Sequence, residues 1–286
     1  MQNLFKICFF VMSICFAASC GQSTIYKPTF AVVSKFVNFS AIAEAGYDYL
    51  ETTVGDFLVP SESDSAFLAN LEQIKQAGAK IISCNVFLPA HLKVTGNDAV
   101  HDEIMLWAET TFSRAQMANI PYIVFGSAGA RNYPDGFDKQ EAVQQYTVLC
   151  KRLAPLAQKY DVTILIEPLN SVESNIINSL EEGAAVVYAV DHPNVLLLCD
   201  IFHMLRDGEP AEEIVKYGDI IRHCHIAEKE TRSVPGMAGD DFRKYFDALK
   251  KINYQGCIAI EADDWDDFGQ RLAPALKYIK KQYGIK

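Results

Sequence analysis

Short apolar runs and longer amphipathic stretches alternate eight times along the chain, and this alternation most limits the fold that the chain can adopt. The apolar runs lack a clean alternation of apolar and polar residues, which is typical of parallel strands covered on both faces. The stretches between them carry apolar residues at helical spacing, so the pattern predicts eight strand–helix pairs. The predicted strands are FAVVSKF, YLETTV, IISCNVFLP, YIVFGS, VTILIEPL, VLLLCDIF, IIRHCHIAE and CIAIEADD.

Eight such pairs in about 250 residues predict a single-domain α/β fold, the (β/α)8 TIM barrel. The chain has 286 residues, half of them hydrophobic, which is enough for a large core. A doubly wound open sheet is the alternative, but no GxGxxG motif follows the first predicted strand, which weakens its dinucleotide-binding version. We therefore assign residues 29–286 to the barrel, with SAIAEAGYDY as a helix opened by Ser40 and AGARNYPDGF as a loop.

Residues 1–19 have the pattern of a secretory signal peptide. Lys6 precedes an apolar run, and three small residues, 17–19, come directly before Cys20. This order looks like a bacterial lipobox and implies cleavage before Cys20 and acylation of its thiol. Residues 20–28 would then form a tether, and the protein would be an exported cell-envelope lipoprotein of the periplasm or outer membrane. The alternative is ordinary cleavage and a soluble secreted protein.

Charge and cysteine content narrow the function classes. The formal net charge of −10 argues against a nucleic-acid partner, which requires clustered Lys and Arg. Five cysteines follow Cys20, an odd number, and most lie in or beside predicted strands. We expect them to be small buried apolar residues, without a disulfide framework and without a catalytic role.

Four consecutive predicted strands each end in a residue that can bind a metal: Glu167, Asp200, His225 and Glu261. Any one of these alone is typical of a solvated loop residue or a helix cap. In a TIM barrel, however, the carboxyl ends of the strands meet at one mouth, where unpaired carboxylates would repel one another. A shared divalent cation would remove that repulsion. Three carboxylates and one imidazole suit Mn²⁺ best, with Mg²⁺, Co²⁺ or Zn²⁺ as alternatives.

Other polar residues near strand ends allow two interpretations each. Glu51 either faces the site or caps the following loop. Arg131, in the glycine-rich segment after the fourth strand, either holds a substrate oxygen or pairs with an acidic neighbour. His223 lies two residues before His225, so it shares a face with it but sits deeper, and we expect it to be hydrogen-bonded in the core.

The segments IEPLN, DIFHM and HCHIAE, a following Arg and Pro-Gly, and a final IE resemble the xylose isomerase-like TIM barrels. The resemblance covers essentially the whole chain after the signal peptide. It is strongest to the sugar-phosphate isomerase/epimerase group, which includes D-tagatose 3-epimerase and hydroxypyruvate isomerase. By this resemblance, Glu167, Asp200, His225 and Glu261 match the metal ligands, and Glu167 and Glu261 also match the catalytic acid/base pair.

The resemblance also assigns substrate-binding residues. Glu173 and His203 match substrate-contacting positions, and Arg232 matches an arginine that holds a substrate oxygen. The segment between His225 and Arg232 is one residue longer than in the epimerases.

The implied activity is that of a divalent-metal-dependent sugar isomerase or epimerase that removes a proton next to a carbonyl and passes through an enediolate. The alternatives are a keto-sugar or inositol dehydratase or lyase using the same site, and a non-catalytic sugar-binding lipoprotein. DNA-repair endonucleases that share this barrel resemble a trinuclear zinc site rich in histidine. The chain has only six histidines and a negative net charge, and both disfavour this function. The expected partners are a small sugar or keto-sugar, a membrane through the lipid anchor only, and a second copy of the chain in a homo-oligomer.

Overall fold

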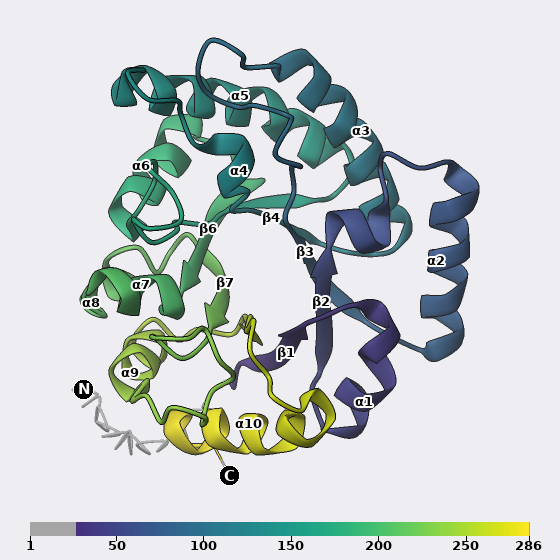
Figure 1. Cartoon of the computed structure of the whole chain (residues 1–286), viewed down its shortest axis with the longest axis vertical. Coiled ribbons are helices and arrows are strands. Elements are labelled where there is room, and N and C mark those ends of the chain that lie inside the picture. The colour runs from purple at the N-terminus through teal and green to yellow at the C-terminus, as the bar shows by residue number, and fades with distance from the viewer. Residues whose placement is uncertain (1–26, 286) are drawn as a thin grey trace, which may run out of the picture.

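The computed structural model describes residues 27–285, and its sheet is one closed barrel of parallel strands in chain order. Figure 1 looks along this barrel and shows the helices forming an outer ring. The predicted single-domain TIM barrel is therefore confirmed. The strands are β1 (Thr29–Val33), β2 (Tyr49–Thr53), β3 (Ile81–Asn85), β4 (Tyr122–Phe125), β5 (Thr163–Ile166), β6 (Val195–Asp200), β7 (Ile221–Ile226) and β8 (Cys257–Ile260). The predicted signal peptide, Cys20 and most of the tether lie outside the described residues.

The helices follow the predicted alternation with three differences. They are α1 (Phe39–Glu44), α2 (Asp64–Ala77), α3 (His101–Met117), α4 (Ala128–Arg131), α5 (Lys139–Lys159), α6 (Leu180–Val190), α7 (Ile201–Asp207), α8 (Glu212–Lys216), α9 (Arg243–Lys251) and α10 (Phe268–Tyr283), with short turns η1 (Phe36–Asn38) and η2 (Val54–Leu58). The segment expected to be a loop contains α4. The polar end of β6 continues into α7, because Asp200 caps that helix. Ser40 lies inside α1 and does not open it.

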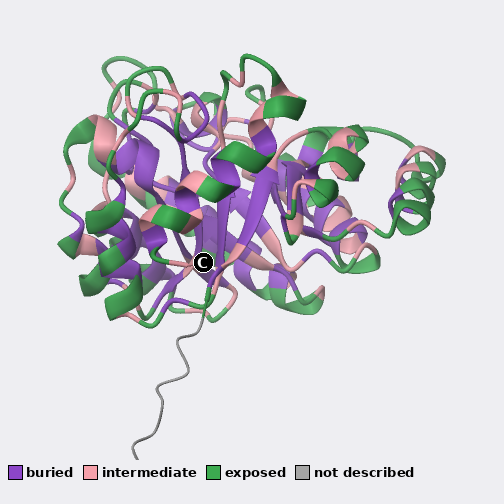
Figure 2. Cartoon of the chain, turned by 90° about the horizontal axis from the view of Figure 1, so that it is seen from below, coloured by how far each residue is buried: buried purple, intermediate pink, exposed green. Residues whose placement is uncertain are grey.

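The main hydrophobic core lies between the strands and the helices that cover them, and the buried strands occupy the centre of the molecule in Figure 2. Two small apolar clusters fill the barrel itself: one contains Ala31, Cys257 and Ala259, and the other contains Val124, Leu165 and Leu198. The cysteines of the described chain are buried and unpaired. Within residues 27–285, no helix has the length and apolar character needed to cross a bilayer.

The two-residue period of the strands decides which side chains enter the barrel. Leu198 lies inside, so Asp200, two residues further along β6, also points inward at the mouth. The register of the sheet places Asp200 opposite His225 on β7, and His225 opposite Ala259 on β8. His223 therefore shares the inner face with His225 one layer deeper, as predicted.

A stack of aromatic rings joins α3 to the outer face of the sheet. Phe112 on α3 stacks on Phe87 at 5.6 Å between ring centroids, and Phe87 meets Phe125 on β4 edge-on at 5.3 Å. The ring of Phe125 in turn stacks on Tyr146 of α5 at 4.8 Å. All four side chains are fully buried, so this stack fixes how α3 and α5 lie on the barrel.

Removal of one ring from this stack tests its contribution. Phe112→Ala leaves a cavity, and we expect it to lower the free energy of unfolding by about 3–5 kcal/mol. Leu106→Ala on the same helix is the matched control: its side chain is 74% exposed, so we expect a change within about 0.5 kcal/mol. Urea unfolding followed by circular dichroism measures both. Equal effects of the two substitutions would contradict this account of the packing.

Candidate metal centre and active site

Four strand-end side chains meet at the carboxyl end of the barrel. Glu167 directly follows β5, Asp200 ends β6, His225 lies near the end of β7, and Glu261 directly follows β8. One donor atom from each residue lies within 4.8 Å of the donor atoms of the other three. The structure thus brings together the four residues that the sequence proposed as a shared ligand set.

His225 is the centre of this group. Its Nδ1 lies 2.9 Å from Oε1 of Glu167 and 3.5 Å from Oε2 of Glu261. Among residues 27–285, Asp200 forms a hydrogen bond through only one of its oxygens: Oδ1 accepts a 2.7 Å hydrogen bond from the backbone N–H of Phe202 and caps α7. Its buried Oδ2 has no hydrogen-bond partner among residues 27–285. A buried carboxylate oxygen without a partner fits a metal ligand, because such an oxygen is otherwise costly.

The electrostatics of the group also fit a cation. Burial raises the pKa of Glu167, and burial raises the pKa of Asp200 to about 7. Burial likewise opposes ionisation of Glu261, but the nearby His225 and Arg232 outweigh it and lower the pKa of that carboxyl group. Two of the three carboxyl groups, Glu167 and Asp200, therefore resist ionisation in this buried space. A divalent cation that prefers oxygen ligands would compensate them.

A second group of possible ligands, Glu51, His223 and His225, lies deeper in the barrel. All three side chains are fully buried. Glu51 Oε2 accepts hydrogen bonds from Ser83 Oγ at 2.6 Å and His223 Nε2 at 2.7 Å, and Oε1 accepts one from His225 Nε2 at 3.0 Å. Both oxygens of the Glu51 carboxylate therefore already have protein donors. The four-residue group is the better metal centre, because Glu167 and Glu261 border an open cavity and Glu51 does not.

Glu51 fits neither interpretation fully, although it contacts the site from below through His225. It neither lines the cavity nor caps the loop after β2, because it lies in the middle of that strand and points into the barrel. Although burial opposes its ionisation, His225 and His223 lower the pKa of Glu51 to about 2. His223 is hydrogen-bonded in the core, as expected.

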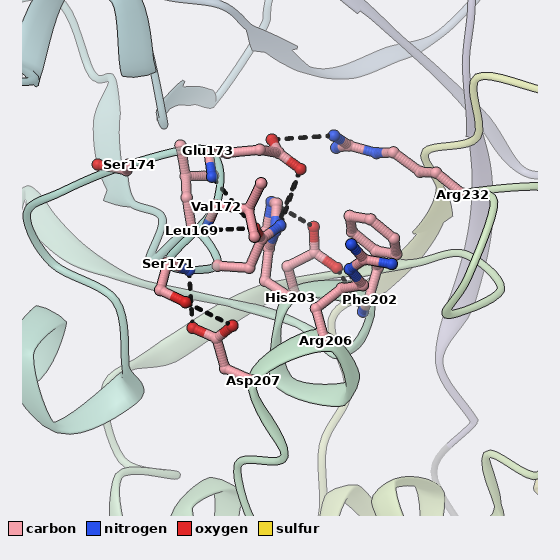
Figure 3. A network of polar contacts seen from close by, with 12 residues as sticks. Leu169, Ser171, Val172, Glu173, Ser174, Phe202, His203, Arg206, Asp207 and Arg232 are labelled. Atoms are coloured by element: carbon pink, nitrogen blue, oxygen red, sulfur yellow. Dashed lines mark hydrogen bonds and ion pairs between the residues drawn. The ribbon is translucent and has the colours of Figure 1, made fainter.

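The metal centre opens into a cavity of about 460 Å³. Arg232 and Glu173 lie in its wall, and Arg232 Nη1 is 3.3 Å from Glu173 Oε2. Arg232 Nη2 also donates to Glu261 Oε2, and its guanidinium carbon lies 4.7 Å from the centre of the Phe202 ring. Figure 3 shows Glu173 between Arg232 and His203. The three residues proposed from the resemblance as substrate-binding thus gather beside the metal centre.

His203 lies between Glu173 and the candidate ligand Asp200. Its Nδ1 is 2.8 Å from Asn170 Nδ2, and its Nε2 is 3.3 Å from Asp200 Oδ2. Burial, together with the positive charge of Arg232, lowers the pKa of His203 to about 3. The imidazole is therefore neutral near pH 7 and can both donate and accept a hydrogen bond.

Arg131 does not fit the first of its two interpretations, which had it holding a substrate oxygen. Its side chain is fully buried and does not line the cavity. Its guanidinium donates to the backbone carbonyls of Glu167 at 2.7 Å and Ile177 at 3.3 Å, and to Ser174 Oγ at 3.3 Å. The reason is local: the segment folds into α4, which directs Arg131 into the protein, where it holds the backbone that carries Glu167.

Two residues of the site were missed from the sequence. Asn85, the last residue of β3, donates from Nδ2 to Glu261 Oε1 at 2.6 Å and lines the cavity. Gly126, directly after β4, lies against the Glu167 carboxylate, and a Cβ built there would be only 2.1 Å from Glu167 Oε2. Both lie at strand ends like the four candidate ligands, but neither asparagine nor glycine is a strong metal-ligand signal.

Comparison with known proteins agrees with the fold. Residues 39–282 match the family model of the xylose isomerase-like TIM barrel. An L-ribulose 3-epimerase of Methylomonas sp. (strain DH-1) is 26% identical, over 92% of this chain and 96% of the relative. Structures of D-psicose 3-epimerase from Clostridium cellulolyticum H10, solved with D-tagatose, and of 3-keto-D-glucoside 4-epimerase from E. coli superpose with TM-scores of 0.78 and 0.76. Each is 18% identical, covers 89% of this chain and is covered over 99% and 100% of its own length, respectively.

The chain belongs to the xylose isomerase-like TIM barrel family. The two structural superpositions establish the barrel at low sequence identity. The names of the relatives agree with the enzyme class expected from the sequence, an isomerase of the sugar epimerase/isomerase type.

Gly126→Ala tests the fit of the Glu167 carboxylate. The added methyl group occupies the space of Oε2, so we expect Glu167 to move and the affinity for Mn²⁺ to fall by at least about tenfold. Equilibrium dialysis against Mn²⁺ measures the loss, and circular dichroism checks that the barrel remains folded.

Gly55→Ala is the matched control for this substitution. A Cβ at Gly55 meets only Thr53 Oγ1, at 4.0 Å, so we expect the Mn²⁺ affinity to stay unchanged. Unchanged affinity in Gly126→Ala as well would mean that Glu167 is not a ligand or that its carboxylate has other space.

Proposed function

We propose that this protein is a divalent-metal-dependent epimerase or isomerase of a neutral keto-sugar, acting by proton transfer next to the carbonyl. The epimerase names of its relatives support the substrate class. The observation that carries the proposal is that two carboxylates, Glu167 and Glu261, approach the same nitrogen of His225 at 2.9 and 3.5 Å while both border one cavity.

Glu167, Asp200, His225 and Glu261 would hold the cation. Mn²⁺ is the proposed ion, and Mg²⁺, Co²⁺ and Zn²⁺ remain alternatives for a site with three carboxylates and one imidazole. When bound, the ion supplies stabilisation of the negative charge that develops on the substrate oxygens as the proton leaves.

Glu167 and Glu261 would carry the protons. They follow strands β5 and β8, so their carboxylates reach the cavity from separate parts of the barrel wall. One takes the proton from the carbon beside the carbonyl, which leaves an enediolate, and the other returns a proton. Return to the opposite face of the same carbon gives the epimer, and return to the adjacent carbon gives the isomer.

Glu173, His203 and Arg232 would hold the substrate. The guanidinium of Arg232 is fixed from two sides by Glu173 and Glu261, so its direction is set before a sugar arrives. The neutral His203 and the Glu173 carboxylate offer hydrogen bonds to hydroxyl groups. Such groups fix the orientation of a small polyol beside the proton-transfer carboxylates.

The charge of the cavity favours a neutral sugar over a phosphorylated one. Glu167, Glu173, Glu261 and Asp263 line it, and Arg232 is the single cationic residue among the lining residues. Arg232 already pairs with two of these carboxylates. A sugar phosphate would therefore add negative charge to a wall that has no unpaired cation to receive it.

Hydrogen exchange with solvent tests the proposed reaction. In D₂O with Mn²⁺, the protein should incorporate deuterium at the carbon beside the carbonyl of a free ketose or keto-glycoside, read by the loss of that proton signal in ¹H NMR. Glu167→Gln and Glu261→Gln should each slow exchange by roughly 10²- to 10⁴-fold, because each removes a proton-transfer group. Glu181→Gln, whose side chain is 70% exposed on α6, should leave the rate unchanged.

The other outcomes distinguish the alternatives. An epimer formed without deuterium would contradict proton abstraction. An unsaturated product would identify a dehydratase or lyase that begins with the same step. Binding of sugar without exchange, with no gain on addition of Mn²⁺, would favour a non-catalytic sugar-binding lipoprotein.

We also propose that the protein is exported and anchored to the cell envelope through a lipid on Cys20. The support is the sequence alone: the apolar run and the small residues at 17–19 that come before Cys20. An exported enzyme is consistent with a neutral substrate, since phosphorylated sugars are largely cytosolic.

Metabolic labelling with an alkyne fatty acid in a bacterial host tests the anchor. The wild-type protein should carry the label and fractionate with membranes, and Cys20→Ser should lose the label. Release of an unlabelled wild-type protein into the soluble fraction would instead support ordinary signal-peptide cleavage.

A further inference from the structure

A buried polar layer lies directly below the proposed metal centre and takes no part in the reaction described above. It consists of Glu51, Ser83 and His223, from β2, β3 and β7, and each of these side chains is fully buried inside the barrel. Polar groups are costly in such a place unless they serve one another or a ligand. The layer meets the metal centre at one residue, His225.

The shortest hydrogen bonds of this layer end on the Glu51 carboxylate, and Ser83 Oγ also lies 3.5 Å from His223 Nε2. Ser83 Oγ and the Nε2 atoms of His223 and His225 lie 2.6, 2.7 and 3.0 Å from its oxygens. An ionised carboxylate can only accept, so both histidines donate an Nε2–H to it. In the described chain, Nδ1 of His223 is buried and has no partner of its own. A buried nitrogen without a hydrogen-bond partner lowers the stability of the fold by about 1–3 kcal/mol. The contact of His223 with Glu51 must therefore bring a gain elsewhere.

That gain is control over the tautomer of His225. A neutral imidazole carries one N–H, and only the other nitrogen has a lone pair for a metal. Glu51 accepts a hydrogen bond from the Nε2–H of His225, so with a cation bound the lone pair would lie on Nδ1, the atom that faces Glu167 and Glu261. The opposite tautomer would direct an N–H at the cation.

We propose that Glu51 is a positioning residue that fixes the tautomer and ring orientation of His225 toward the cation, and that His223 and Ser83 hold Glu51 in place. This inference rests on the proposed metal-dependent function. It assigns the deeper cluster of Glu51, His223 and His225 to support of the single metal centre rather than to a second one. Partners of this kind raise metal affinity because the ligand needs no reorientation on binding.

Metal binding, measured without any sugar, tests the proposal. In Glu51→Gln, the amide has one accepting oxygen for three donors, so His225 loses its fixed partner. We expect the dissociation constant for Mn²⁺, read from the electron paramagnetic resonance signal of the free ion, to rise by roughly 10- to 100-fold. In the Mg²⁺-loaded wild-type protein, ¹⁵N NMR should find His225 protonated on Nε2 only, with a slowly exchanging proton that exchanges faster in the variant.

Two further variants give the comparison. Thr52→Val changes the next residue of β2, which is equally buried but points to the outer face of the sheet, and it should leave the Mn²⁺ affinity unchanged. Glu51→Asp keeps the charge but withdraws it by one methylene group. It should weaken Mn²⁺ binding to an intermediate degree, and it gives the same test if Glu51→Gln does not fold.

The outcomes separate this inference from the proposed function. Equal Mn²⁺ affinity in wild type and in both Glu51 variants, with only a lower melting temperature of the metal-free protein, would overturn the positioning role and leave the metal centre intact. A His225 protonated on Nδ1 in the Mg²⁺-loaded protein would overturn it as well. A wild-type protein that binds no divalent cation would overturn both.

Discussion

The imidazole of His225 lies between two carboxylates, with Nε2 3.0 Å from Glu51 and Nδ1 2.9 Å from Glu167. Each ring nitrogen has a different task, because one faces the closed interior of the barrel and the other faces its open mouth. The rest of the site depends on this division. Carboxylates below the ring can be satisfied by protein donors alone, whereas Asp200 Oδ2 above it finds no hydrogen-bond partner in the described chain. A cation at the mouth would give this oxygen a partner and balance its negative charge.

The barrel keeps these groups in place through contacts that do not touch a substrate. Arg131 ties the backbone of Glu167 to the segment around Ile177, and Gly126 leaves the space that the Glu167 carboxylate occupies. Arg232 adopts a left-handed backbone conformation, with φ of 49°, and its carbonyl accepts a hydrogen bond from the backbone N–H of Asp263, in the loop after β8. Such a conformation costs energy in a residue other than glycine, so the surrounding loop must hold it. The site is therefore supported on several sides before any ligand binds, which is the condition for efficient proton transfer.

Much of this could be predicted from the pattern of residues. Runs such as VLLLCD and RHCHI predicted strands, because parallel strands that are covered on both faces are apolar along most of their length. The positions of Glu167, Asp200, His225 and Glu261 at strand ends predicted that they meet at one end of the barrel. The predictions failed where a side chain's direction depended on a short irregular segment. One of the two interpretations of Arg131 had it holding a substrate oxygen, but the turn of α4 directs it inward. Asn85 lay at a strand end like the ligands, yet its place beside Glu261 depends on contacts across the barrel.

The sequence by itself determined the number and order of the strand–helix units and the parity of each strand, because both follow from local apolar periodicity. It thereby determined that His223 and His225 share an inner face and that the four donor residues lie at one end of the barrel. Only the tertiary structure decided which of the polar residues share one centre and which form the closed layer beneath it. Distances across the barrel depend on the pairing of β1 with β8 and on the register shifts at β2–β3 and β6–β7. Those are contacts between distant parts of the chain, and no local pattern specifies them.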